Sequence, residues 1–274
     1  MFINCKGQLI DLSAPKVMGI INITPDSFYS GSRSNTEKEI LSIAEKMLTE
    51  GATFLDLGAY SSRPGATDIS AEEELKRMLP AIEIIIREFP DILLSIDTFR
   101  AEVAEKSIEA GAAIINDISA GKLDNNMLAV IARFQVPYIM MHMKGTPQTM
   151  KEFNQYKDIT SDVLFYFSER INAARELGIN DLIIDPGFGF AKNIEQNFEL
   201  LAKLELFQNL DLPLLVGVSR KSMIWKKLKI STEEALNGTT SLNTAALLKG
   251  ANILRVHDVK EAKECIKLTH ELIK

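Results

Sequence analysis

Cysteine and histidine, the residues that build disulfide frameworks and soft-metal sites, are scarce in this chain. Its 274 residues include two cysteines, Cys5 and Cys265, near opposite ends, and three histidines. Two thiols so far apart make no disulfide framework, and so few ligands exclude a His/Cys metal cluster. The chain also lacks an apolar run of roughly 18 to 20 residues, the length that spans a bilayer. Residues 1–16 have no charged segment followed by an apolar one, as a secretory signal would. We therefore expect a cytoplasmic protein.

An excess of positive charge is also missing. The formal net charge is −6 and the sequence pI is about 5.3. No global basic field favours nucleic acid or an anionic membrane, so any anion site must be local. Hydrophobic residues make up 46% and charged residues 25% of the chain. This balance is typical of a globular protein with a sizeable core, and it excludes the disordered and fibrous classes.

No Pro/Gly/Ser-rich linker or change in composition divides the chain. Instead, short apolar runs alternate eight times with longer amphipathic stretches, the pattern of a parallel sheet covered by helices. The apolar runs are residues 16–21, 53–57, 92–96, 112–116, 137–141, 181–185, 213–218 and 252–256, and the clearest helical stretches are 37–50, 71–88, 100–110 and 158–177. We predict an α/β fold in which residues 1–274 form a single (β/α)8 TIM barrel, since eight parallel strands close on themselves more readily than they split. An open, doubly wound sheet is the alternative.

A repeated glycine supports this count of units. Gly51, Gly111, Gly178 and Gly250 each stand between the end of a helical stretch and the start of an apolar run. Glycine takes the left-handed conformation at little cost, so we predict that all four terminate helices.

Polar residues stand at or just beyond the ends of the apolar runs, where barrels carry their chemistry. They are Asn22, Asp56, Arg63, Asp97, Asn116, Asp117, His142, Asp185, Ser219, Lys221, Arg255 and His257. For Asp56 and Asp117, a cap on the following helix is an equal alternative, and for His142 a structural role is favoured. Asp97, Asn116 and Asp185 lie where burial without a partner is costly, so we interpret them as ligand-binding.

These residues are sorted by type along the chain. The first six runs contribute mainly carboxylates and amides, which suit a planar heterocycle with amino and ring N–H donors, and Asp185 could bind such a ring through both oxygens. The last two runs contribute cations, which suit a phosphate or carboxylate. In "LLVGVSRKSMI" (214–224), Ser219 and Lys221 are predicted to face the mouth of the barrel. Arg220 has the opposite parity and is predicted to be structural.

Two loops extend the predicted site. "DPGFGFAK" (185–192) has glycines that let the backbone approach a flat ring, with Phe190 favoured over Phe188 as the aromatic cover. "NITPDSFYSGSR" (22–33) has the profile of a mobile lid. The methionines of "MMHMKGTPQTM" are typical of flexible core filling, with Met140 as an exception because it lies near a strand end.

Eight stretches, in order and over nearly the whole chain, resemble dihydropteroate synthase. They are "MGIINITPDSF", "GATFLDLGAYSSRPGA", "SIDTFR", "GAAIINDIS", "IMMHMKGTPQTM", "DPGFGF", "VGVSRKS" and "GTTSLNTAALLKGANILRVHDV". The resemblance implies a cytoplasmic transferase and sulfonamide target, homodimeric, with a (β/α)8 fold. It would join 6-hydroxymethyl-7,8-dihydropterin pyrophosphate to p-aminobenzoate in folate biosynthesis, releasing pyrophosphate.

The resemblance also implies roles for individual residues. The pterin would bind Asp97, Asn116, Met140, Asp185 and Lys221; the pyrophosphate would bind Asn22, Arg63, Arg255 and His257, with Mg²⁺ on Asn22; and p-aminobenzoate would bind Phe28, Ser62, Arg63, Pro64, Phe190, Ser219 and Lys221. Asp97 and Lys221 would be catalytic. We expect a dissociative displacement, in which pyrophosphate departs ahead of attack by the weakly nucleophilic arylamine. Tyr60, Ser62 and Ser30 depart from the family pattern, in which Glu, Thr and Asp are common.

Two other functions share part of this pattern. Barrels that hold methyltetrahydrofolate for a corrinoid partner have a similar Asp/Asn ring but no pyrophosphate site, so the cations of the last two runs argue against them. In an aldolase or isomerase barrel, Lys221 would be a Schiff-base nucleophile.

Overall fold

The computed structural model describes residues 1–23, 33–60 and 68–272, and eight parallel strands of these ranges form a barrel. They are β3 (Lys16–Asn22), β4 (Phe54–Gly58), β5 (Leu93–Asp97), β6 (Ile114–Asp117), β7 (Tyr138–Met141), β8 (Leu182–Asp185), β9 (Leu215–Val216) and β10 (Ile253–Val256). Their order in the sheet is β8-β7-β6-β5-β4-β3-β10-β9. A parallel bridge between Ile184 and Leu214, with the Ile184 N–H donating to Pro213 at 2.9 Å, joins the two edge strands. The predicted (β/α)8 barrel is confirmed.

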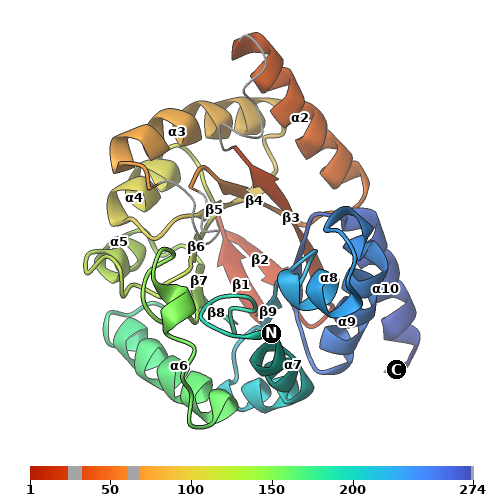
Figure 1. Cartoon of the computed structure of the whole chain (residues 1–274). Coiled ribbons are helices and arrows are strands. Elements are labelled where there is room, and N and C mark those ends of the chain that lie inside the picture. Colours follow the sequence, from red (N-terminus) through yellow and green to blue (C-terminus); the bar gives the residue numbers. More distant parts are fainter. Residues whose placement is uncertain (24–32, 61–67, 273–274) are drawn as a thin grey trace.

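Helices surround the strands (Figure 1). They are α2 (Arg33–Thr49), α3 (Ala71–Glu88), α4 (Ala101–Glu109), α5 (Met127–Phe134), α6 (Ile159–Glu176), α7 (Ile194–Ala202), α8 (Ser222–Leu228), α9 (Leu236–Leu248) and α10 (Val259–Leu272), with short 3₁₀ helices η1 (Met150–Glu152), η2 (Leu204–Leu210) and η3 (Glu233–Ala235). The predicted stretches 71–88 and 158–177 match α3 and α6 to within one residue. No helix of the described ranges is long and apolar enough to cross a membrane.

Local signals explain these boundaries. Ser70 accepts a hydrogen bond from the Glu73 N–H at the start of α3, and Asn193 and Gln196 form a capping box at the start of α7. All four glycines predicted to end helices have positive φ, from 75° at Gly178 to 106° at Gly111. Their predicted role is confirmed.

The strand register decides which side chains face the interior of the barrel. Asp56 pairs with Ser95, and Asp97 pairs with Asn116, so these four residues share the inner face. Below them lies an apolar cluster that includes one residue from each strand: Met18, Phe54, Leu93, Ile114, Ile139, Ile183, Leu215 and Ile253. The lower barrel is therefore a packed core, and the polar residues lie above it.

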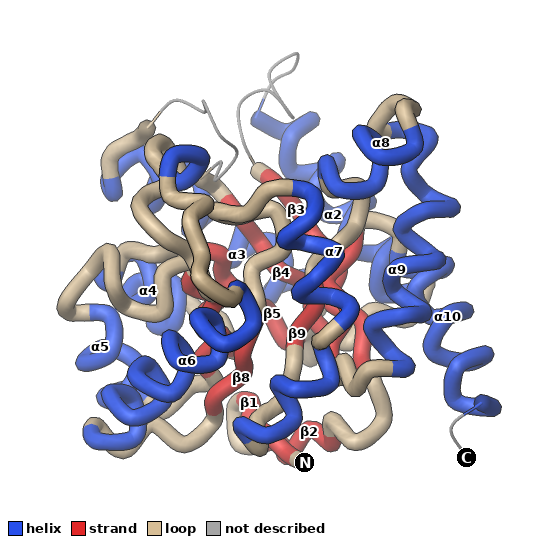
Figure 2. Tube along the Cα trace, turned by 60° about the horizontal axis from the view of Figure 1, so that its bottom comes forward, coloured by secondary structure: helices blue, strands red, loops and turns tan. Residues whose placement is uncertain are grey.

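An N-terminal hairpin, which the sequence did not lead us to expect, closes the bottom of this core (Figure 2). β1 (Phe2–Cys5) and β2 (Gln8–Asp11) pair antiparallel through a turn at Lys6 and Gly7, both with positive φ. Ile3, Cys5 and Leu12 pack against the inner cluster. The two residues Lys6 and Gly7 between the short runs "FINC" and "QLID" are the turn signal that the sequence offers for this hairpin.

Candidate active site

A buried network of ion pairs and hydrogen bonds lies at the C-terminal ends of the strands. Arg255 on β10 donates from Nε to Asp56 Oδ2 at 2.6 Å and from Nη2 to Asp97 Oδ2 at 2.7 Å. Asp56 is fully buried and also accepts from Ser95 Oγ at 2.6 Å and Asn116 Nδ2 at 3.0 Å. Asp56 is therefore an anchor for Arg255 and Asn116, and not the cap of a helix.

Asp97 is the network carboxylate that reaches toward the mouth. Its side chain is 18% exposed. Burial raises the pKa of Asp97 to about 7, although the nearby Arg255 guanidinium opposes this shift. A side-chain carbon at Gly58 would lie 3.6 Å from Asp97 Cβ and 3.8 Å from Asn22 Oδ1, so the glycine leaves space between the two. Asp97 can therefore exchange a proton near neutral pH beside an open position.

Asp185 and Lys221 form the second charged part of the site. Asp185 is 5% exposed and accepts a hydrogen bond from the Gly187 N–H at 2.8 Å, and burial raises its pKa. Lys221 Nζ donates to the Phe188 carbonyl and lies 5.0 Å from the centroid of the Phe190 ring. Burial lowers the pKa of Lys221 to about 8, with Asp185 acting in the opposite direction. An acceptor, a cation and an aromatic face thus meet at one side of the mouth.

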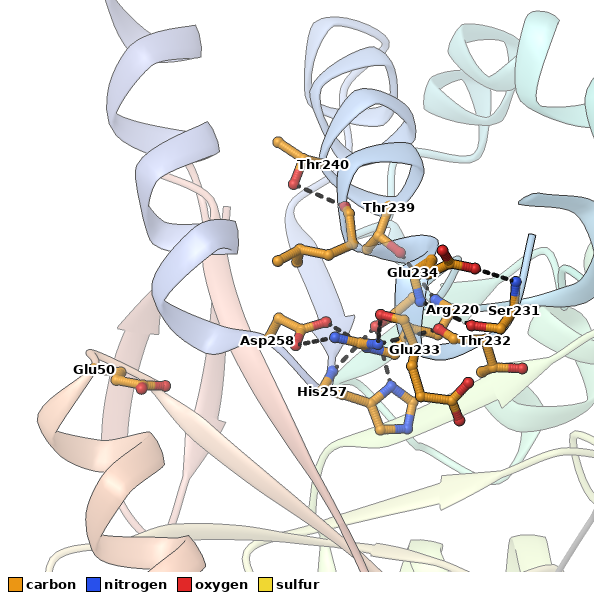
Figure 3. Close-up of polar contacts among 12 residues, drawn as sticks. Glu50, Arg220, Ser231, Thr232, Glu233, Glu234, Thr239, Thr240, His257 and Asp258 are labelled. Atoms are coloured by element: carbon orange, nitrogen blue, oxygen red, sulfur yellow. Dashed lines mark hydrogen bonds and ion pairs between the residues drawn. The ribbon is translucent and has the colours of Figure 1, made fainter. Parts of the chain in front are cut away.

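The loops after β9 and β10 lie against each other. Ser219 Oγ is 3.0 Å from His257 Nδ1, and the His257 N–H donates to Ser219 Oγ at 3.2 Å. Arg220 donates from Nε and Nη2 to both oxygens of Asp258 at 2.9 Å (Figure 3). It also donates to the Thr232 and Glu233 carbonyls. The predicted structural role of Arg220 is confirmed.

The register places Met140 outside the barrel, contrary to its prediction as a pterin contact. Met140 pairs with Ile184 and with Asp117 on the outer face and belongs to the core beneath the helices. Met141 pairs with Asp185 and packs with Phe190. The pairing of Asn116 with Ile139 shows that Ile139 and Met141 face the interior, and this register between two strands is not contained in the sequence.

Asp117 and His142 have structural contacts. Asp117 accepts from the Ser119 and Gly121 N–H groups and from Tyr138 Oη, and so shapes the turn after β6. His142 is 1% exposed, and burial, together with nearby lysines, holds its pKa well below the usual value. Its Nδ1 lies 2.9 Å from Lys192 Nζ.

Some predicted site residues lie outside the described ranges: Phe28, Ser62, Arg63 and Pro64, together with the departure at Ser30. Tyr60 is described. It is 8% exposed, and its hydroxyl accepts a hydrogen bond from Gln148 Nε2 at 2.7 Å. Within the described residues, no group of three or more His, Cys, Asp or Glu side chains is arranged to hold a metal.

Comparison with known proteins identifies the family. A pterin binding enzyme model matches residues 18–257. Dihydropteroate synthase of Escherichia coli K12 is 43% identical over 265 residues, which are 96% of this chain and 93% of that protein. The chain belongs to the dihydropteroate synthase family.

Two solved structures of this family have the same fold as this chain. The Yersinia pestis enzyme in complex with a sulfonamide drug has a TM-score of 0.93, is 40% identical and covers 100% of this chain and 99% of its own. The Xanthomonas albilineans dihydropteroate synthase with 4-aminobenzoic acid has a TM-score of 0.91 and is 36% identical; the match covers 99% of this chain and 98% of that one.

Proposed function

We propose that this chain condenses 6-hydroxymethyl-7,8-dihydropterin pyrophosphate with p-aminobenzoate, forming 7,8-dihydropteroate and pyrophosphate in folate biosynthesis. Membership of the dihydropteroate synthase family supports this activity. The observation that carries the proposal is the separation of hydrogen-bond acceptors from cations around the mouth of the barrel. Buried acceptors lie on β5, β6 and β8. The cations come from two other strands: Lys221 follows β9, Arg255 lies on β10 and His257 follows β10.

The acceptors are assigned to the pterin. We propose that Asp185, Asn116 and Asp97 accept its amino and ring N–H groups, with Lys221 and Met141 beside the ring. Asp185 lies next to the Gly187 turn, and the Asn116 amide is oriented by its bond to Asp56. A fixed ring of acceptors avoids reorganisation when the ligand binds.

The cations are assigned to the pyrophosphate. Arg255 uses Nε and Nη2 for the carboxylates, so we propose that its Nη1 edge and His257 face the leaving group, with Arg63 joining them from the loop after β4. The lone amide oxygen of Asn22, close to Asp97 across Gly58, fits Mg²⁺, which keeps waters and takes other ligands from substrate phosphates. When bound, Mg²⁺ would stabilise the charge that develops on the pyrophosphate.

The p-aminobenzoate subsite is assigned to Phe190, Ser219 and Lys221, together with Phe28, Ser62, Arg63 and Pro64. Ser219 is held by its contacts with His257, and these contacts support a subsite beside the one proposed for pyrophosphate. We propose that pyrophosphate departs before the arylamine attacks, because an arylamine is a weak nucleophile whose lone pair is delocalised into its ring. Asp97 would then stabilise the pterin cation as it forms.

The domain organisation, location, oligomeric state and inhibition of the protein are proposed from its resemblance to the family. We propose a single-domain, cytoplasmic homodimer that sulfonamides inhibit by competing with p-aminobenzoate.

The decisive test is formation of 7,8-dihydropteroate together with pyrophosphate, which should require both substrates. Absence of both products when both substrates are present would exclude the proposed reaction. Failure together with binding of methyltetrahydrofolate would favour the corrinoid-linked alternative. Covalent trapping of a carbonyl substrate on Lys221 by borohydride would favour an aldolase.

The pyrophosphate assignment is tested with His257→Ala. This change should weaken binding of the pyrophosphate ester far more than binding of the pterin alcohol, measured by calorimetry. His270→Ala removes an exposed histidine at the end of α10 and is the matched control. Equal losses for both ligands in His257→Ala would show that His257 is structural.

A further inference from the structure

Lys192 lies at the centre of the loop that follows β8. Its Nζ is 2.9 Å from the Gly187 carbonyl, 3.0 Å from the Phe190 carbonyl and 2.9 Å from His142 Nδ1. These three acceptors lie within 3.0 Å of the amine, and the His142 carbonyl is a fourth, more distant acceptor at 3.5 Å. The amine therefore ties two points of the loop to the residue that follows β7.

The backbone of this loop needs such support. Gly187, Gly189 and Ala191 all have positive φ, of 70°, 84° and 50°. The two glycines adopt this conformation at little cost, but Ala191 does not. The loop also passes very close to the preceding strand end, because a side-chain carbon at Gly187 would lie 2.2 Å from the His142 carbonyl oxygen.

The same loop carries three contacts of the candidate active site. The Gly187 N–H donates to Asp185 Oδ1 at 2.8 Å. The Phe188 carbonyl accepts from Lys221, and the Phe190 ring lies beneath that lysine. Displacement of the loop would therefore move the acceptor, the cation and the aromatic face together.

The surroundings of Lys192 also fit a role in the loop. Among the described residues it has no ion pair within salt-bridge distance. Burial lowers its pKa well below the usual value; the Asp185 charge opposes this, while Lys221 and Lys144 add to it. Enclosing a lysine amine without a carboxylate partner is unfavourable for stability, so its place in the loop supports a role in the site.

We propose that Lys192 is a positioning residue of the active site: by binding Gly187, Phe190 and His142 it sets the loop so that Asp185, Lys221 and Phe190 meet the substrates. This role rests on the proposed function and extends it to a residue that does not touch the substrate.

Lys192→Met keeps the aliphatic chain and removes the three donors. We expect kcat/KM for the pterin pyrophosphate to fall by about 10- to 100-fold, because small misplacements of binding groups cost this much. The Kd of the pterin alcohol should rise with it. Lys122→Met is the matched control, since Lys122 lies over the Tyr166 ring, which packs edge-on against His142, but does not bond to the loop; its kinetics should equal those of the wild type.

The measurements are made well below the unfolding temperature and expressed per folded molecule. A lower Tm with unchanged Kd and kcat/KM would overturn the proposal, because it is the result of a purely structural role. If Lys192→Met does not fold, the same criterion applies to Lys192→Gln, which retains two donors on a shorter chain.

A second test measures the energetic coupling between Lys192 and the Phe190 ring with a double-mutant cycle. If Lys192 acts through the loop, Phe190→Leu should cost less in the Lys192→Met background than in the wild type, and full additivity would contradict this. The wild-type protein is assayed alongside. Absence of pyrophosphate release by the wild type would reject the proposed function, whereas an active wild type with an unaffected Lys192→Met would reject only the role of Lys192.

Discussion

Replacing Asp97 with asparagine should stabilise the ligand-free protein while it slows the reaction. Asp97 accepts a hydrogen bond from Arg255, and an asparagine oxygen can accept the same bond. What the substitution removes is the cost of keeping a negative charge at this position. Burial outweighs the attraction of Arg255 there, and the pKa of Asp97 is raised to about 7.

The size of this effect follows from the difference between the folded and unfolded pKa. An unfolded aspartate titrates near 3.9, and each pKa unit corresponds to about 1.4 kcal/mol, so full ionisation in the folded state costs at most about 4 kcal/mol. The side chain is 18% exposed, and solvent screens part of this, so we expect about 2 to 3 kcal/mol. The folded state holds the proton between about pH 4 and pH 7. The contribution of Asp97 to stability is therefore greatest at low pH and is lost as the pH rises to about 7.

Urea unfolding of the wild type and Asp97→Asn at about pH 5 and pH 8 tests this reasoning. The variant should be more stable by about 2 to 3 kcal/mol at the higher pH and by about 1.5 kcal/mol at the lower, where the unfolded aspartate is ionised and the folded one is not. Asp91→Asn, at an exposed position, is the control and should change stability little at either pH. A variant less stable than the wild type at pH 8 would show that the ion pair with Arg255 outweighs burial. Single-turnover rates should fall in Asp97→Asn more than pterin affinity does.

Three further substitutions test separate parts of the structure. Asp185→Asn should raise the calorimetric Kd of the pterin by about 10- to 100-fold, because the amide presents a donor to an N–H group; an unchanged Kd would remove Asp185 from the pocket. Gly187→Ala should lower the free energy of unfolding by about 2 to 4 kcal/mol, because its new carbon would lie 2.2 Å from the His142 oxygen; wild-type stability in urea would contradict this contact. Arg220→Lys should cost about 1 to 2 kcal/mol, since an ammonium cannot bind both oxygens of Asp258; an unchanged Tm would show that this contact adds nothing.

The sequence predicts the barrel well because its signals are local. Alternating apolar and amphipathic stretches, with glycines at the helix ends, give eight strands and the helices between them. The predicted run 213–218 contains only a two-residue strand, β9. There the edges of the barrel meet, and pairing depends on Ile184, which is distant in the sequence. The N-terminal hairpin was missed because its burial depends on the barrel floor that it covers.

The types of residue at the site could be predicted from the sequence. The contacts that these residues make across the barrel could not, because they join strands that are distant in the sequence. Asp97, Asn116 and Asp185 could be located at strand ends, but the insertion of Arg255 between Asp56 and Asp97 depends on β10 lying close to β4 and β5. The sequence therefore placed Arg255 among the cations, where the structure also gives it two carboxylate partners. Lys192 shows the same limit, because its three acceptors belong to two loops.

The hairpin beneath the barrel gives the protein a built-in reporter of partial opening. Cys5 is fully buried there, and burial raises the pKa of its thiol to about 12. Cys265, on the inner side of α10, is 4% exposed. Because both thiols are buried, the folded enzyme should be inert to thiol reagents. Labelling of Cys5 then measures how often the hairpin detaches from the barrel floor, at the opposite end from the chemistry. A ligand that slows labelling of Cys5 would show that occupation of the mouth tightens the whole barrel.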